Sequence, residues 1–256
     1  MKIKFNKENN GFTFGFAIVM IVIVATLLSV TAINLKPLQD ENIKQEKMQN
    51  ILKTIRVNCT REESPAKFEE FVKQRLVLNS RAKVISEKKG DIDKNDKGDA
   101  FNIDIQKEYK SSMATEERNY PLFICEKDGK KYYVIPMTGK GLWGPIWGYI
   151  ALEEDYNTVY GASFDHKTET PGLGAEIRYE LFQNQFVGER ILDKNDNFIS
   201  IKVIKGGAAP DDKHGVDAIT GGTITSNGVT EMLKRTIEIY VPCFNNNKNK
   251  LTINEH

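Results

Sequence analysis

The feature that most constrains this chain is the stretch 9–35, which contains no charged residue. Its middle, residues 16–28, is almost continuously apolar. A helix needs about 20 such residues to cross the hydrocarbon core of a bilayer. A cleaved signal peptide has a shorter apolar region, of about 7–15 residues, followed by a small-residue cleavage site that is not evident here. We therefore predict an uncleaved transmembrane helix over residues 9–35.

The charges that precede this helix predict its orientation. Lys2, Lys4 and Lys7 stand before it and are opposed only by Glu8. Positively charged flanks of a membrane helix stay in the cytoplasm. Residues 1–8 are therefore expected to form a cytoplasmic tail, and the chain beyond the helix is expected to lie outside the cytoplasm.

Composition excludes several classes of function. The 36 Lys and Arg residues nearly balance the 35 Asp and Glu residues, and there is no basic block, so no nucleic-acid partner is expected. Cys59, Cys125 and Cys243 are too scattered for a zinc site or a disulfide scaffold. His166 and His214 lack ligand-spaced partners. We expect no metal site and no catalytic side chain.

The part beyond the anchor is expected to be a stalk followed by one domain. Apolar residues at helical spacing over residues 36–59 indicate a helical stalk that continues the anchor. Residues 60–256 are long enough for a folded domain. Helix and strand patterns follow one another there without regular βαβ alternation, which indicates an α+β fold.

Local patterns predict the elements of this domain. Ser64-Pro65 is typical of a helix start, with Ser64 as the cap. The expected elements, in chain order, are a helix whose apolar face holds Phe68, Phe71, Val72 and Leu76, a strand over 101–105, a hairpin of 122–125 and 132–135 around Asp128-Gly129, a strand pair over 146–152 and 158–164, a helix from the Gly-rich segment 169–176 to about Gln183, a strand over 198–204, and a helix over 229–240.

The segment 217–228, Asp-Ala-Ile-Thr-Gly-Gly-Thr-Ile-Thr-Ser-Asn-Gly, carries the most informative chemistry. Hydroxyl side chains and glycines before a helix leave backbone N–H groups and the positive end of the helix dipole free for a phosphate. The lysine of a P-loop is missing after the glycines. An ordinary helix start, with Ser226 or Asn227 as N-cap, explains part of the same pattern. On the residues alone, a phosphate site and a capped helix both stay open.

Within this segment, Asp217-x-x-Thr220-Gly221-Gly222-Thr223 resembles the flavinylation motif Asp-x-x-Ser/Thr-Gly-Ala-Thr of the covalent-FMN-binding domain family. In that family the last threonine is joined through its hydroxyl to the phosphate of FMN by a phosphoester bond. The resemblance therefore implies covalent FMN on Thr223. Gly222 stands where the motif usually has alanine, and the lost methyl leaves the tight turn possible.

Further segments are similar to the C subunits of the sodium-translocating NADH:quinone oxidoreductases. They are Gly141–Trp143, Gly148–Glu153, Glu169–Gly174 and Thr225–Val229. The resemblance covers the N-terminal anchor and, separately, residues of about 138–240. We expect the second region to be the FMN-binding core.

The resemblance also implies which residues surround the flavin. Trp143 and Leu173 are expected to be the apolar walls of the ring, Thr170 to reach its edge, and Lys140 to be a further candidate for the phosphate. The glycines would let the backbone approach closely. The expected cofactor-binding residues are Trp143, Thr170, Gly172, Leu173, Gly174, Asp217, Thr220, Gly221, Gly222, Thr225 and Ser226.

The function that the resemblance implies is electron transfer in a bacterial inner membrane, with the domain in the periplasm. Electrons from NADH would pass through the FMN toward quinone, with other subunits as partners, and sodium pumping would belong to those subunits. A separate FAD-dependent flavin transferase would attach the FMN.

Two alternatives stay open. One is the G subunit of the related Rnf complex, which has a similar architecture. Residues 226–229, which follow the motif, and the additional segment 60–120 favour the C subunit of the sodium-translocating enzyme instead. The other is an anchored binding module without redox function, whose Thr/Gly segment only caps a helix.

Overall fold

The computed structural model describes residues 10–110 and 118–254. The predicted cytoplasmic tail, residues 1–8, lies outside the described residues. The chain divides into two compact units, Met1–Glu46 and Lys47–His256. Helix α1, Asn10–Thr54, contributes to both units.

In the first unit, α1 presents exposed apolar side chains, such as Ile21 and Leu28, over its N-terminal part. Among the described residues, it is the one helix that is long and apolar enough to cross a membrane. This finding confirms the prediction of one N-terminal apolar helix.

The second unit is built on a six-stranded antiparallel sheet with the strand order β2-β1-β3-β4-β5-β6. Asp128 and Gly129 join β3 to β4 with φ of 53° and 74°. Positive φ at both central residues is the geometry of a type I′ hairpin turn, so the predicted hairpin is confirmed. The strands are β1 Val72–Leu78, β2 Val84–Lys88, β3 Tyr120–Lys127, β4 Lys130–Lys140, β5 Pro145–Leu152 and β6 Val159–His166.

Helices and a small second sheet complete this unit and confirm the predicted α+β class. They are α2 Ser64–Phe71, η1 Ala100–Asn102, α3 Ile105–Lys110, η3 Gly174–Arg178, α4 Glu180–Gln183, η4 Asn184–Phe186, the parallel pair β7 Lys202–Ile204 and β8 Gly215–Asp217, and α5 Thr223–Asn254.

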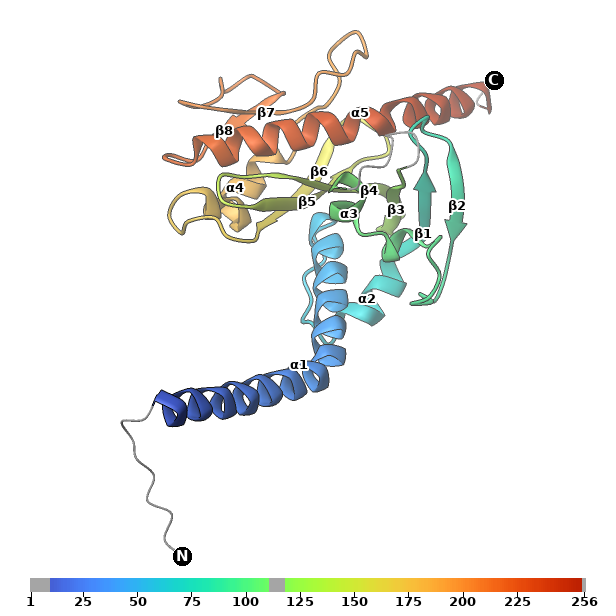
Figure 1. Ribbon diagram of the computed structural model, residues 1–256. Coiled ribbons are helices and arrows are strands. Elements are labelled where there is room, and N and C mark those ends of the chain that lie inside the picture. Colours follow the sequence, from blue (N-terminus) through green and yellow to red (C-terminus); the bar gives the residue numbers. More distant parts are fainter. Residues whose placement is uncertain (1–9, 111–117, 255–256) are drawn as a thin grey trace, which may run out of the picture. The chain divides into compact units, whose positions relative to one another are not determined.

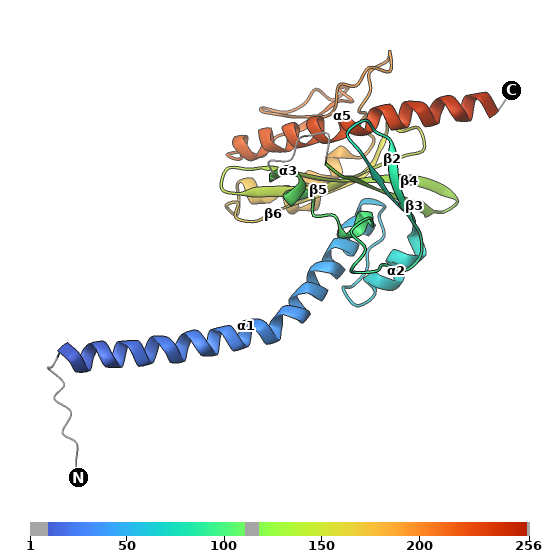
Figure 2. The same cartoon turned by 45° about the vertical axis from the view of Figure 1, so that its right-hand side comes forward.

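Both faces of the six-stranded sheet are covered. Successive side chains of a strand point to opposite faces, so on β4 Tyr133 and Ile135 join one hydrophobic cluster while Tyr132 and Val134 join the other. Helix α5 packs on the first face, and the end of α1 with α2 packs on the second (Figures 1 and 2).

Two glycines bring α5 unusually close to β4. A Cβ at Gly139 would lie 2.9 Å from the Cβ of Met232, and one at Gly228 would overlap the carbonyl oxygen of Lys140. Such an approach excludes any larger residue at either position unless the backbone moves. The first turns of α5 are therefore held against the end of β4.

The end of α1 belongs to the domain rather than to a free stalk. Met48, Ile51 and Leu52 are buried in the cluster on the second face. The Lys47 ammonium donates to the carbonyl oxygen of Phe101 at 2.5 Å. The sequence predicts a stalk over residues 36–59 and a domain from residue 60. The compact unit begins earlier, at Lys47, so it includes the second half of the predicted stalk.

The predicted strand over 101–105 is wrong, because η1 and the start of α3 occupy this segment. The Asp99 carboxylate accepts from the N–H of Phe101 at 2.9 Å. The Asp104 carboxylate accepts in the same way from the N–H groups two and three residues further on. These bonds start helical turns and outweigh an alternating apolar pattern.

The predicted helical face that included Val72 and Leu76 is also wrong. Helix α2 ends at Phe71, and β1 follows at once because it pairs with β2 on one side and β3 on the other. The N-cap position is Glu63 rather than Ser64. The helix expected to reach Gln183 is split into η3 and α4, and the strand expected over 198–204 is limited to β7.

Arg75 of β1 ties the polar loop after β2 to the sheet. It is 1% exposed, contacts both carboxylate oxygens of Asp99 at 2.8–3.0 Å, and donates to the carbonyl oxygens of Gly90 and Asp91. Removing one partner of a buried ion pair leaves the other charge uncompensated.

We predict that Arg75→Met lowers the free energy of unfolding by about 3–5 kcal/mol, measured by denaturation of the full chain in detergent. Lys67→Met, which breaks the exposed pair with Glu70, is the control and should have little effect. Equal stability of the two variants would contradict this account of Arg75.

Candidate functional site

A cavity of about 210 Å³ lies where the β4–β5 loop, the turn after β6 and the start of α5 meet. It contains most of the site residues expected from the sequence. Its lining residues are Leu142, Trp143, Glu169, Thr170, Leu173, Gly174, Gly221, Gly222, Thr223, Ile224 and Thr225.

The other expected site residues are not part of the lining of this cavity. Asp217 accepts from the N–H of Ala208 at 2.8 Å and so holds the turn after β7. Gly172 has a φ of 75°, a conformation that favours glycine, and Thr220 is exposed. The buried hydroxyl of Ser226 accepts from the N–H of Ile219 at 3.3 Å.

Helix α5 begins at Thr223, before the caps expected from the sequence. Ser226 and Asn227 lie inside its first turns, and the N–H of Ser226 donates to the carbonyl oxygen of Gly222 at 2.9 Å. The expectation that Ser226 or Asn227 is the N-cap is therefore wrong. The N–H groups of the first turn have no acceptor within the helix, and Thr223, Ile224 and Thr225 of this turn line the cavity, so the positive end of the helix dipole lies at the cavity wall.

The structure distinguishes the hydroxyl groups of this segment. The Thr225 hydroxyl is buried and donates to the Glu169 carboxylate at 2.5 Å, and the Ser226 hydroxyl is buried as well. Thr220 is outside the lining. Thr223 is half-buried in the cavity wall, and within the described part of the chain its hydroxyl has no hydrogen-bond partner. It is the hydroxyl best placed for reaction.

The apolar walls of the cavity are solvent-exposed side chains. Trp143 is 66% exposed and Leu173 is 39% exposed, although both are large and apolar. Gly221, with a φ of 75°, leaves room for Leu173, because a Cβ there would lie 2.5 Å from its Cδ2. Exposed apolar groups around a hollow are typical of a ligand site.

Glu169 is the residue of this site that the sequence did not single out. It is 5% exposed, and its carboxylate accepts from the Thr225 hydroxyl and from the N–H of Trp143 at 2.8 Å. Burial by itself would raise the pKa of Glu169, but hydrogen bonds from Thr225 and from the 142–144 backbone outweigh burial and lower this pKa. The carboxylate is therefore ionised at neutral pH.

Two glycines make room for this carboxylate. A Cβ at Gly141 would lie 2.6 Å from its Oε1, and a Cβ at Gly174 would overlap its Oε2 and the Thr225 hydroxyl. An acidic residue just before a Gly-rich turn was the signal in the sequence. Only the folded chain shows that these separate segments meet on it.

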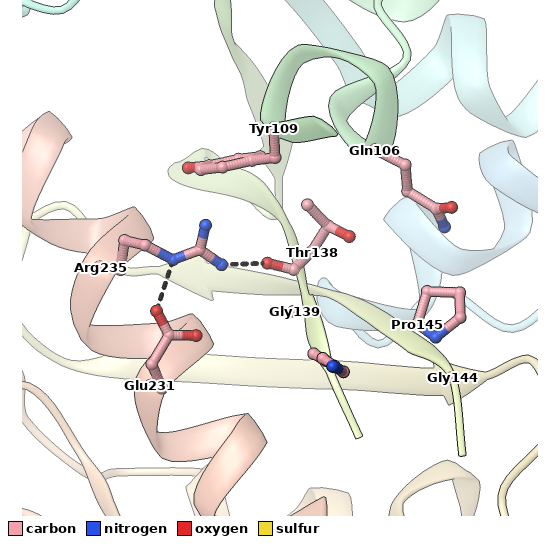
Figure 3. A pocket seen from close by; sticks show the side chains of 9 residues that line it. Gln106, Tyr109, Thr138, Gly139, Gly144, Pro145, Glu231 and Arg235 are labelled. Carbon is pink, nitrogen blue, oxygen red and sulfur yellow. Dashed lines mark hydrogen bonds and ion pairs between the residues drawn. The ribbon is translucent and has the colours of Figure 1, made fainter. Parts of the chain in front are cut away.

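A second cavity, of about 450 Å³, lies further along α5 (Figure 3). Lys140, the further candidate for the phosphate, lines this cavity and is not among the lining residues of the smaller one. Arg235 is already engaged, since it donates to the carbonyl oxygen of Thr138 at 2.6 Å, pairs with Glu231 at 2.7 Å and lies 4.3 Å from the ring centre of Tyr109. Of these two cavities, the hydroxyl-bearing turn lines the smaller one.

Comparison with known proteins agrees with the location of the smaller cavity. The FMN-binding domain family matches residues 141–238, a span that contains every residue of its lining. The fold and the site thus define an FMN-binding domain that follows an N-terminal apolar helix in the sequence.

Curated relatives identify the family. The C subunit of the Na(+)-translocating NADH-quinone reductase of Vibrio vulnificus is 31% identical over 227 residues, which is 87% of each chain. The corresponding protein of Haemophilus ducreyi is 31% identical over 247 residues, 90% of this chain and 91% of that one. The chain belongs to the family of C subunits of the Na(+)-translocating NADH-quinone reductases, which confirms the resemblance seen in the sequence.

Solved structures share the fold. The crystal structure of the C subunit from Parabacteroides distasonis is 38% identical, has a TM-score of 0.72, and is matched over 82% of this chain and 96% of that one. NqrC of Shewanella oneidensis is 27% identical with a TM-score of 0.64, over 79% and 98% of the two chains.

The adjacent glycines of the motif give a matched pair of variants. A methyl at Gly221 meets Leu173 at 2.5 Å and sits on a left-handed backbone, whereas one at Gly222 meets the side chain of Ile219 at 3.0 Å and the backbone nitrogen of Gly174 at 3.4 Å, on a backbone without positive φ. We predict that Gly221→Ala lowers the free energy of unfolding by about 1–3 kcal/mol and that Gly222→Ala has a smaller effect. Denaturation of both full-chain variants checks this, and the opposite order would contradict it.

Proposed function

We propose that this chain is a membrane-anchored flavoprotein subunit that carries electrons on an FMN joined through its phosphate to Thr223. When bound, the FMN would supply the redox chemistry, and the chain would hold it and adjust its environment. The observation that carries the proposal is the Thr223 hydroxyl, which lies in the cavity wall at the start of α5 with no hydrogen-bond partner among the described residues, while the Thr225 and Ser226 hydroxyls are buried and engaged.

Attachment to Thr223 requires a phosphoryl transfer from FAD, catalysed by a separate flavin transferase. The Thr223 oxygen would form a bond to the FMN-side phosphorus of FAD, the bond from that phosphorus to the AMP oxygen would break, and the hydroxyl proton would leave to solvent. The free N–H groups and dipole of the α5 start favour the phosphate that remains there.

The cavity supports a flavin that is held on one side and open on the other. Trp143 and Leu173 would contact the ring, and Thr170 and the glycines 172 and 174 would border it. A volume of about 210 Å³ is less than the roughly 300–1,000 Å³ of pockets that enclose a ligand of this size. An open edge suits electron exchange with a neighbouring subunit.

The relatives are named as subunits of a Na(+)-translocating NADH-quinone reductase, which supports partner subunits for this chain. Electrons from NADH would pass through it toward quinone. The uncharged segment 9–35 offers no ion pathway, so sodium translocation would belong to other subunits. Lys2, Lys4 and Lys7 support a cytoplasmic N-terminus and a periplasmic domain.

We predict that Thr223→Ala abolishes covalent flavin when the full chain is co-expressed with a flavin transferase, while the domain stays folded. A half-buried hydroxyl without partners contributes little to stability. The measurements are in-gel flavin fluorescence, the mass of the peptide that contains residue 223, and thermal unfolding.

Asn227→Ala is the matched control, because this exposed side chain lies in the first turns of the same helix, outside the motif and outside the cavity lining; it should keep the flavin on Thr223. Covalent flavin on the Thr223→Ala variant would contradict the assignment of Thr223 as the attachment residue. A wild-type chain that remains unmodified in transferase-competent cells would favour the anchored binding module instead.

Trp143 is predicted to stack on the flavin without being needed for attachment. Trp143→Ala should retain covalent flavin, while its flavin fluorescence rises several-fold because an adjacent indole quenches it. Trp143→Phe, which keeps an aromatic ring, should retain the protein's stability and show a smaller increase. An unchanged emission in Trp143→Ala would exclude this contact.

A further inference from the structure

We propose that Glu169 is the positioning residue of the FMN site: it joins the loop that carries Trp143 to the helical turn that carries Thr223, and it keeps a negative charge in the cavity wall that lowers the reduction potential of the flavin. This inference rests on the proposed function. It adds a residue that neither the motif nor the predicted set of cofactor contacts contains.

The first step is that Glu169 bonds to both sides of the cavity at once. Its Oε1 accepts from the N–H of Trp143 at 2.8 Å, and its Oε2 accepts from the hydroxyl of Thr225 at 2.5 Å. Thr225 stands two residues after Thr223 in the first turn of α5. One carboxylate therefore links the expected ring wall and the expected phosphate anchor.

The second step is that Trp143 depends on this bond for its position. Its side chain is 66% exposed, so packing does not hold it. The loop itself is closed by one bond from the N–H of Gly141 to the carbonyl oxygen of Gly144 at 2.8 Å. The ends of this loop are held by the β4–β5 ladder, and the contact with Glu169 joins its Trp143 to the turn after β6.

The third step is that the local packing is arranged around the carboxylate. Gly141 and Gly174 flank it so closely that a Cβ at either position would collide with its oxygens. The N–H of Glu169 donates to Nδ1 of His166 at 3.1 Å, which holds its own backbone as well. An exposed carboxylate would not require glycine at the neighbouring positions.

The fourth step concerns charge. The donors to Glu169 are N–H and O–H groups, which stabilise the ionised form but leave a net negative charge in the wall of the cavity. Reduction adds electrons to a flavin, and a nearby negative charge disfavours that addition. Removing the charge should therefore raise the reduction potential.

The test compares Glu169→Gln with the wild type, both as full chains co-expressed with flavin transferase and purified in detergent. Glutamine keeps the shape and the ability to accept from the Trp143 N–H, but removes the charge. We expect covalent flavin to remain on the peptide that contains Thr223. The oxidised-to-reduced ratio at a fixed potential should fall about tenfold, which is about 30 mV for a two-electron couple.

Glu176→Gln is the matched control. Glu176 lies in the same region and accepts from one backbone N–H, that of Gly172 at 2.9 Å, but it does not line the cavity. Its potential should equal that of the wild type. A Glu169→Gln potential that also equals the wild type would overturn the charge part of the proposal.

Glu169→Asp tests the positioning part and covers the case in which Glu169→Gln does not fold. It keeps the charge but is shorter by one methylene, so the Trp143 loop loses its bond. The potential should stay close to that of the wild type while flavin fluorescence rises; unchanged fluorescence would overturn the positioning role. If the wild-type peptide carries no flavin mass, the proposed function fails instead, and the two failures are thus distinguishable.

Discussion

The site depends on the close approach of α5 to the end of β4. At Gly228 the helix backbone lies against the carbonyl oxygen of Lys140, and at Gly139 the strand leaves room for Met232. These contacts place the start of α5 next to the loop that connects β4 to β5. A side chain at Gly228 would push the helix away, and the turn that carries Thr223 would move with it.

The same packing separates two cavities of different character. In the larger one, the guanidinium of Arg235 is engaged by Glu231, by a main-chain carbonyl and by the ring of Tyr109. In the smaller one, the start of a long helix offers backbone N–H groups and an unengaged hydroxyl. An anion is favoured where donors remain free, so the smaller cavity is the one that suits a phosphate.

Glu169 shows how a buried charge can organise a site made of loops. Loops are usually the mobile parts of a fold, yet here the β4–β5 loop, the turn after β6 and the first turn of α5 meet on one ionised carboxylate. The pKa of Glu169 is lowered rather than raised, which means that its hydrogen bonds stabilise the charged form by more than burial destabilises it. Gly141 and Gly174 leave room for this carboxylate, because a Cβ at either position would collide with its oxygens.

The sequence by itself determined those features whose cause is local. The apolar helix follows from a long uncharged stretch, the β3–β4 hairpin from Asp128-Gly129, the amphipathic part of α5 from its period of 3.6, and the family from the motif that ends at Thr223. Local rules failed where two causes competed. At 101–105 the capping carboxylates of Asp99 and Asp104 outweighed an alternating pattern.

Only the tertiary structure decided which hydroxyl is free and what holds the site together. The motif marks Thr223 by resemblance alone; the physical difference between Thr223 and Thr225 is the contact of Thr225 to Glu169, which lies far away along the chain. The same holds for the domain boundary at Lys47, which depends on apolar residues of α1 packing under a sheet formed much later in the sequence. Pattern and propensity describe neighbours along the chain, whereas burial and hydrogen-bond partners are set by segments that meet only after folding.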